Sequence, residues 1–295
     1  MTAYALPEPV RPLAEMKASF DALAERIRRQ ADGKPILYLI NPGNYGDALI
    51  GFGATLFFED YGIEVRPCTL SNRWQKVRSA LVNLSTQPTG GNLLIYGGSG
   101  AWCKATYVAQ RVVGLNARVS KNILVLPSTY EDIRPPAGVA AYARDRFESL
   151  EKIGSGLFCH DMAFYMALVD KDRILPNRRP PSKGLGLFFR VDNEARAHGF
   201  AALPRNYDLS ATGSELSDPT EFLRYLDDFE SIATDRLHVA IGATILGKKV
   251  AMVPGNYFKI RAIYESSVAP YFDNCALKTD EEVRSFLNAA RAAEA

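Results

Sequence analysis

The stretch Ser231-Ile232-Ala233-Thr234-Asp235-Arg236-Leu237-His238-Val239-Ala240-Ile241 predicts a short buried strand followed directly by a helix. The strand is expected to end at Ala233. Thr234 or Asp235 is expected to cap the helix, because either side chain can accept hydrogen bonds from the free N–H groups of a first turn. Residues 250–253 are expected to form the next strand. A strand, a helix and a second strand in this order are the unit of a parallel α/β sheet.

Arg236 and His238 fall in the first turn of this predicted helix. Free N–H groups and the helix dipole favour an anion there. An arginine offers a planar fork for phosphate or carboxylate, and a histidine can move a proton near neutral pH. The pair could equally be an arginine in a salt bridge and a structural histidine whose hydrogen bonds are satisfied. The segment alone leaves both interpretations open.

The alternation of strands and helices extends along most of the chain. Further strands are expected at 36–40, 63–70, 92–96, 122–126, 156–160 and 185–189. Further helices are expected at 13–29, 48–59, 72–84, 106–113, 138–153, 219–227, 259–265 and 280–293. Such alternation predicts an α/β fold built on parallel sheets.

The length of 295 residues suggests two domains, each large enough for its own core. We expect an N-terminal α/β domain at 1–175, a proline-rich linker at 176–184 and a C-terminal α/β domain at 185–295. The terminal helix at 280–293 could pack back on the N-terminal domain.

Composition and charge exclude several classes of protein. The chain is 47% hydrophobic and 23% charged, and its net charge of +2 gives no electrostatic footprint for nucleic acid. The cysteines are far apart and form no metal-type pairs, so we expect reduced thiols and no metal site. They are Cys68, Cys103, Cys159 and Cys275.

The sequence shows neither a signal-peptide pattern at its start nor an apolar run near the ~18–20 residues of a membrane span. A cytoplasmic location is therefore expected. Because a soluble enzyme can work at a bilayer surface, a membrane-bound substrate stays open.

Three glycine-containing loops, at 41–47, 97–100 and 254–257, follow predicted strands. Ligands of open α/β sheets bind at that edge, where glycine lets the backbone approach them. The first two loops match neither the dinucleotide-binding nor the P-loop glycine pattern. Asp47 is expected either to cap the helix at 48–59 or to orient or deprotonate a hydroxyl of a bound acceptor.

A cluster of polar residues surrounds the helix start one strand beyond Arg236 and His238. It consists of Asn256, Tyr257, Lys259 and Arg261. Consecutive strands of a parallel sheet are usually neighbours, so the two helix N-termini are predicted to face one pocket. The alternative is a solvated basic helix start. Arg144, expected within the helix at 138–153, could be a surface residue or a pocket arginine.

These pieces together resemble the polysaccharide pyruvyl transferase family over about residues 36–268. The matching stretches are N-P-G-N-Y-G-D-A-L-I at 41–50, G-G-S-G at 97–100, R-D at 144–145, T-D-R-L-H at 234–238, L-G-K-K-V at 246–250 and N-Y-F-K-I-R at 256–261. The resemblance implies two Rossmann-like domains facing a cleft, as in the glycosyltransferase-B-like fold, with the acceptor on the N-terminal and the donor on the C-terminal side. It also implies that phosphoenolpyruvate pyruvylates a sugar of a bacterial exopolysaccharide repeat unit as a ketal.

The resemblance implies a role for each matching residue. His238 and Arg236 would be catalytic. Lys259, Arg261, Asn256, Tyr257 and Arg144 would bind the donor, and Asn44, Asp47, Gly98 and Trp102 the acceptor. Trp102 could stack on a sugar or simply pack. His238 would act as a general acid, protonating the enol carbon or assisting phosphate departure.

No metal is demanded, and phosphoenolpyruvate is expected as a substrate without a further cofactor. The acceptor saccharide could be lipid-linked at the inner membrane, and the sequence does not fix the oligomeric state. Two other functions stay open. One is a nucleotide-sugar glycosyltransferase of the same fold. The other is a non-catalytic saccharide-binding protein, against which the retained Arg236, His238 and Lys259 argue.

Overall fold

The computed structural model describes residues 10–69, 91–100, 102–103, 108–192, 195–196 and 199–294. The chain divides into two compact units. The N-terminal unit contains Ala14–Gly43 and Ile50–Tyr165, and the C-terminal unit contains Asn44–Leu49 and the chain from Met166 onward. The segment Asn44–Leu49 thus groups with the later half of the chain, whereas the linear division at residue 175 assigned it to the earlier half. The assignment of acceptor and donor sides stays a prediction.

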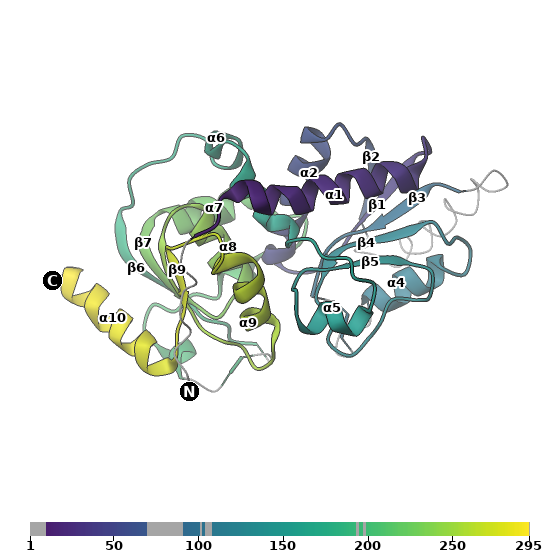
Figure 1. Ribbon diagram of the computed structural model, residues 1–295. Helices are drawn as coiled ribbons and strands as arrows, with labels where there is room; N and C mark the ends of the chain where they lie inside the picture. The colour runs from purple at the N-terminus through teal and green to yellow at the C-terminus, as the bar shows by residue number, and fades with distance from the viewer. Residues whose placement is uncertain are drawn as a thin grey trace. The chain divides into compact units, whose positions relative to one another are not determined.

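The N-terminal unit is built on a parallel sheet with the strand order β2-β1-β3-β4-β5 (Figure 1). The strands are β1 (Ile36–Ile40), β2 (Val65–Thr69), β3 (Leu93–Tyr96), β4 (Ile123–Ser128) and β5 (Ala140–Ala143). Among the described residues up to 174, the helices are α1 (Leu13–Ala31), α2 (Tyr45–Asp60), α4 (Val108–Asn116), α5 (Glu148–Ile153), the 3-10 helix η1 (Met162–Leu168) and α6 (Lys171–Ile174). Strands β1, β3 and β4 confirm the strands that were predicted from apolar runs at these positions. Continuous apolar runs are typical of strands that are buried on both faces.

The predicted helix at 138–153 is wrong in its first half. Residues 140–143 form β5, paired with β4 in the register Leu124 with Ala140. Alanine favours helices, but pairing along β4 overrides that local preference. The expected strand at 156–160 is reduced to one bridge, between Phe158 and Ala143. The helix expected at 72–84 lies outside the described residues.

The C-terminal unit contains a second parallel sheet, with the strand order β6-β7-β8-β9. Its strands are β6 (Lys183–Phe188), β7 (Phe229–Thr234), β8 (Lys249–Met252) and β9 (Cys275–Leu277). Its helices are η2 (Phe200–Ala202), η3 (Leu209–Thr212), α7 (Pro219–Asp227), α8 (Leu237–Ile245), α9 (Lys259–Ile263), the π-helix η4 (Tyr264–Val268) and α10 (Asp280–Glu294). Consecutive strands are neighbours, as expected. Across the described residues, no helix combines the length and the apolar character needed to span a bilayer.

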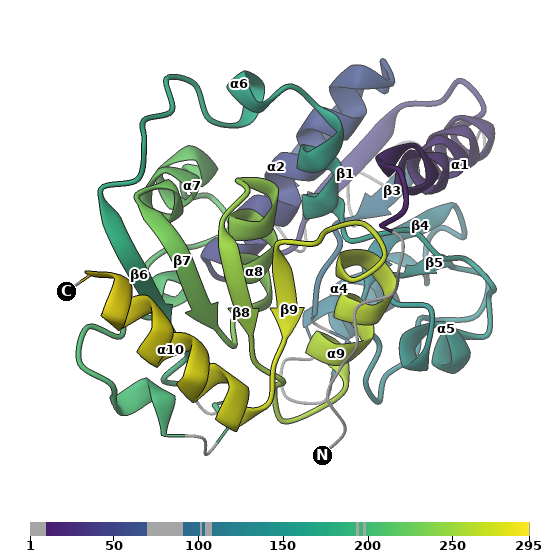
Figure 2. The same ribbon diagram turned by 60° about the vertical axis from the view of Figure 1, so that its left-hand side comes forward.

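Helices cover both faces of the second sheet, as adjacent residues of β6 show. Leu187 packs in a core with Val283 and Leu287 of α10, whereas the ring of Phe188 contacts Tyr225 of α7. Successive strand residues point to opposite faces, so α10 and α7 lie on opposite sides. Figure 2 shows α10 lying across the strands of this sheet. The terminal helix therefore packs on the sheet of its own unit. The expectation that it also packs back on the N-terminal domain stays a prediction.

His160 makes the stability of the N-terminal unit depend on pH. Its ring is buried beside Phe20, Phe158 and Phe164. Burial, and secondly the charge of Arg146, lowers the pKa of His160 to about 3. The unfolded chain takes up a proton near the ordinary pKa of 6.5, which the folded chain does not, so stability falls as the pH drops below that value.

We expect the free energy of unfolding to fall by about 2 kcal/mol between pH 7.5 and pH 5 because of this histidine. Urea unfolding followed by tryptophan fluorescence measures it, since both tryptophans precede residue 166. The substitution His160→Asn should flatten the pH dependence, whatever its effect on absolute stability. An unchanged slope in the variant would contradict the assignment.

Candidate active site

The carboxyl ends of β6, β7 and β8 bring three loops to one edge of the C-terminal sheet. Ligands of open α/β sheets bind at this edge. Thr234 connects two of the strands, because its Oγ1 donates to the Phe188 carbonyl at 2.6 Å and accepts from the Arg236 N–H at 2.9 Å. Arg236 is the residue at the N-cap of α8. The expected cap at Thr234 or Asp235 is therefore wrong by one or two residues.

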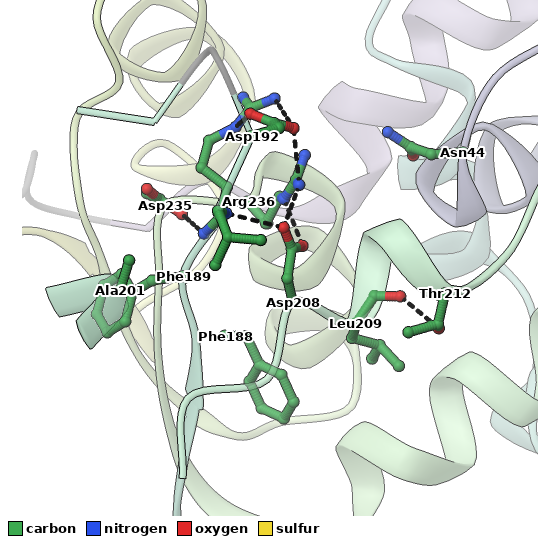
Figure 3. A network of polar contacts seen from close by, with 12 residues as sticks. Asn44, Phe188, Phe189, Asp192, Ala201, Asp208, Leu209, Thr212, Asp235 and Arg236 are labelled. Atoms are coloured by element: carbon green, nitrogen blue, oxygen red, sulfur yellow. Dashed lines mark hydrogen bonds and ion pairs between the residues drawn. The ribbon is translucent and has the colours of Figure 1, made fainter. Parts of the chain in front are cut away.

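The guanidinium of Arg236 is buried and ion-paired (Figure 3). It donates from Nε and Nη2 to the two carboxylate oxygens of Asp208 at 2.8 and 2.5 Å, and from Nη2 to Asp192 at 2.9 Å. Asp208 also accepts the Val191 N–H at 3.0 Å. The salt-bridge interpretation thus holds for Arg236. A bidentate pair fixes the plane of the guanidinium. Asp208 therefore orients the Arg236 side chain as well as neutralising its charge.

Three residues of this network were not among the predicted site residues: Arg190, Asp192 and Asp208. Arg190 donates through Nε and Nη2 to Asp192 at 2.8 and 2.9 Å, and its backbone N–H donates to Asp235 at 2.8 Å. One signal was available, because Arg190 and Asp192 follow directly after a predicted strand. No such pattern marks Asp208, which lies in a polar stretch without clear periodicity.

The first turn of α2 is organised by Asn44. Its side-chain oxygen accepts the Gly46 N–H at 2.8 Å, while its own N–H donates to the Asp47 carboxylate at 3.0 Å. This reciprocal pair is a capping box with Asn44 as the N-cap. The predicted N-cap at Asp47 is therefore wrong, and the helix begins at Tyr45, three residues earlier than expected. The Tyr45 hydroxyl donates to the Asp218 carbonyl at 2.8 Å, which attaches this turn to the start of α7.

His238, the second residue of α8, lies against this same turn. A β-carbon built on Gly46 would stand 2.5 Å from Nδ1 of His238 and 3.0 Å from Oδ1 of Asn44. Only a glycine leaves this room. The G-N-Y-G-D stretch and the D-R-L-H stretch, nearly 200 residues apart in the sequence, therefore meet inside one compact unit.

The substitution Gly46→Ala is expected to move the His238 ring and lower turnover at this site on the order of tenfold, because small displacements of a reacting group are costly. Gly51→Ala, on the same helix, is the matched control: a β-carbon there meets nothing within 4 Å. That control should keep its turnover. Steady-state kinetics of both variants make the comparison, and equal turnover in the two would refute the positioning role of Gly46.

The loop after β8 contributes Asn256, whose side chain donates to the Ala195 carbonyl at 3.2 Å and so contacts the loop after β6. The Lys259 ammonium lies 4.9 Å from the centre of the Tyr257 ring. Arg261 pairs with Glu265 at 2.9 Å, one turn further along. Helix α9 begins at Lys259 as expected. The convergence of Lys259 and Arg261 with Arg236 and His238 on one pocket stays a prediction.

The predicted site residues of the N-terminal unit are buried. Arg144 follows β5, where it donates to Asp161 at 2.6 Å and to Thr129 at 2.7 Å. A β-carbon on Gly98 would stand 2.6 Å from the Pro127 carbonyl oxygen, so glycine is needed there for packing. Trp102 is fully buried in the core around β3 and β4, and takes the packing role of its two expected roles. The ligand roles of Arg144 and Gly98 stay predictions.

Two comparisons with known proteins found matches. A family model described as Polysaccharide pyruvyl transferase matches residues 44–257, from the cap of α2 to the loop after β8. No curated protein matches the chain. A crystal structure described as a functional uncharacterized protein KP1_0663 from Klebsiella pneumoniae subsp. pneumoniae NTUH-K2044 matches with a TM-score of 0.69 and 24% identity, covering 90% of this chain and 98% of that chain. That likeness concerns the fold alone.

Proposed function

The chain belongs to the polysaccharide pyruvyl transferase family, and we propose that it transfers the pyruvyl group of phosphoenolpyruvate to a sugar of a bacterial exopolysaccharide repeat unit as a ketal. The proposal rests on one observation: the first turns of α2 and α8 meet, so that His238 lies against Gly46. Arg236 precedes His238 by two residues, at the N-cap of α8. The family supports pyruvyl transfer to polysaccharide in general. That phosphoenolpyruvate is the donor and that a sugar of an exopolysaccharide repeat unit is the acceptor is our proposal.

The donor suits the charges at this edge of the sheet. Phosphoenolpyruvate carries a phosphate and a carboxylate on one small frame, and arginine forks with a helix N-terminus are matched to such anions. Arg236 would hold the donor while Lys259, Arg261, Asn256, Tyr257 and Arg144 assist. The aimed guanidinium provides stabilisation that needs no rearrangement as charge develops.

His238 would supply the proton. Protonation of the enol carbon makes the neighbouring carbon electrophilic. One sugar hydroxyl then adds to that carbon, a second displaces phosphate, and the two hydroxyl protons balance the new methyl group and the released phosphate. Assistance to phosphate departure is the alternative use of the same acid. Asn44 and Asp47 would lie on the acceptor side, and we propose an acceptor that is lipid-linked at the cytoplasmic face of the inner membrane.

The decisive experiment incubates the protein with phosphoenolpyruvate and candidate acceptors, free or lipid-linked, and follows phosphate release and product mass. A three-carbon ketal on the acceptor with equimolar phosphate is expected. Transfer of a whole sugar from a nucleotide sugar would establish a glycosyltransferase instead. Acceptor binding without either product would establish a saccharide-binding protein.

A further inference from the structure

The carboxylate of Asp192 lies between two guanidinium groups. Arg190 donates from Nε to Oδ1 at 2.8 Å and from Nη2 to Oδ2 at 2.9 Å. Arg236 donates from Nη2 to the same Oδ2 at 2.9 Å. Arg190, from the loop after β6, therefore holds this carboxylate in the fork geometry that guanidiniums use for carboxylate ligands. Arg236, from the loop after β7, adds one further hydrogen bond.

The two aspartates of the network differ in how firmly they are built in. Asp208 is 6% exposed, contacts Arg236 with both oxygens and accepts the Val191 N–H. Asp192 is 44% exposed, although the arginines that it contacts are 11% and 6% exposed. Solvent reaches the Asp192 carboxylate, so another anion can take its place against the two arginines without leaving either guanidinium uncompensated. Exchange of Asp208 would leave Arg236 buried without its main counter-charge.

We propose that Arg190 and Arg236 form the site for the donor's carboxylate, and that Asp192 occupies this site until the donor displaces it. This inference rests on the proposed function and assigns residues within the same site. Asp192 carries the planar two-oxygen group that the donor also carries, so one fork fits both. Asp208 would keep Arg236 in place during the exchange, and Asp235 would keep the Arg190 backbone in place.

Asp192 then acts as a positioning residue in the empty site. It holds both guanidiniums in the orientation that a carboxylate needs, which reduces the ordering required on binding. It also competes with the donor, so its removal should strengthen binding. Asparagine has the same shape and one remaining acceptor oxygen but no charge, which makes Asp192→Asn the appropriate variant.

The test measures dissociation constants of phosphoenolpyruvate, pyruvate and inorganic phosphate by calorimetry or NMR titration. We expect Asp192→Asn to bind phosphoenolpyruvate and pyruvate about tenfold more tightly. We expect Arg190→Lys, which keeps the charge but loses the fork, to bind both about tenfold more weakly. The control is Asp228→Asn, which removes the same charge from the exposed pair with Lys183 and should change nothing.

Unchanged or weaker pyruvate binding by Asp192→Asn would overturn the proposal. Tighter binding of phosphate alone would also overturn it, by assigning the fork to the donor's phosphate. Folding is checked by thermal unfolding of each variant, and Arg190→Lys tests the same fork if Asp192→Asn does not fold. A different result would refute the proposed function: wild-type protein that forms no ketal. That result is independent of how the variants bind pyruvate.

Discussion

The substitution His238→Ala is expected to lower ketal formation by about 10²- to 10⁴-fold while leaving phosphoenolpyruvate binding within a few-fold of the wild type. Loss of a general acid removes stabilisation that exists only in the transition state, so kcat falls and the donor's dissociation constant does not. His238 lies beside Gly46 in the first turn of α8. No other imidazole in the described part of the C-terminal unit could replace it.

Imidazole rescue makes this test specific. The truncated side chain leaves room beside Gly46, so added imidazole should restore part of the activity of His238→Ala and none of the activity of Gly46→Ala. Single-turnover phosphate release, measured with and without imidazole, separates the chemical step from product release. Near-normal turnover of His238→Ala on a competent acceptor would exclude the general-acid role.

The substitution Asp208→Asn is expected to destabilise the C-terminal unit by about 3 kcal/mol, because it removes the main counter-charge of the buried Arg236. Arg236 is 6% exposed and contacts both oxygens of Asp208. An asparagine keeps one acceptor oxygen but loses the charge. The same change should misorient the arginine and weaken phosphoenolpyruvate binding.

Hydrogen exchange in β7, the strand that leads into Arg236, reports this loss locally. We expect faster exchange of the 229–234 amides in Asp208→Asn and lower urea resistance of the whole chain. Asp228→Asn is the matched control, since its pair with Lys183 is about half exposed and should contribute at most about 1 kcal/mol. Equal effects of the two variants would show that Asp208 is an ordinary surface partner.

Local patterns predicted an element correctly where its residues suit only one type of secondary structure. The apolar run at 36–40 could only be a buried strand, and residues 219–227 form α7 between the limits expected from Pro219 and Asp227. The helix predicted at 138–153 is wrong in its first half because alanine favours helices when only its local sequence is considered. Its state was decided by pairing of Ala140 with Leu124 on β4, a contact that no local pattern contains.

The candidate site shows the same limit. The motifs pointed to Arg236, His238, Asn44 and Asp47, but the counter-ion Asp208 lies in a stretch without periodicity. The sequence predicted that His238 faces the helix that begins at Lys259, and this stays a prediction. The structure shows a neighbour that the sequence did not indicate, the first turn of α2, where Gly46 has no side chain to keep the ring away.

By itself the sequence determined the parallel α/β class, most strands and the family motifs, because strand burial and strand–helix alternation are encoded in neighbouring residues. Only the tertiary structure decided which carboxylates hold Arg236, that Asn44–Leu49 groups with the later half of the chain, and that α10 packs on β6 and β7. These outcomes depend on the energies of contacts between residues distant in the chain. Such contacts leave no periodic trace in the sequence.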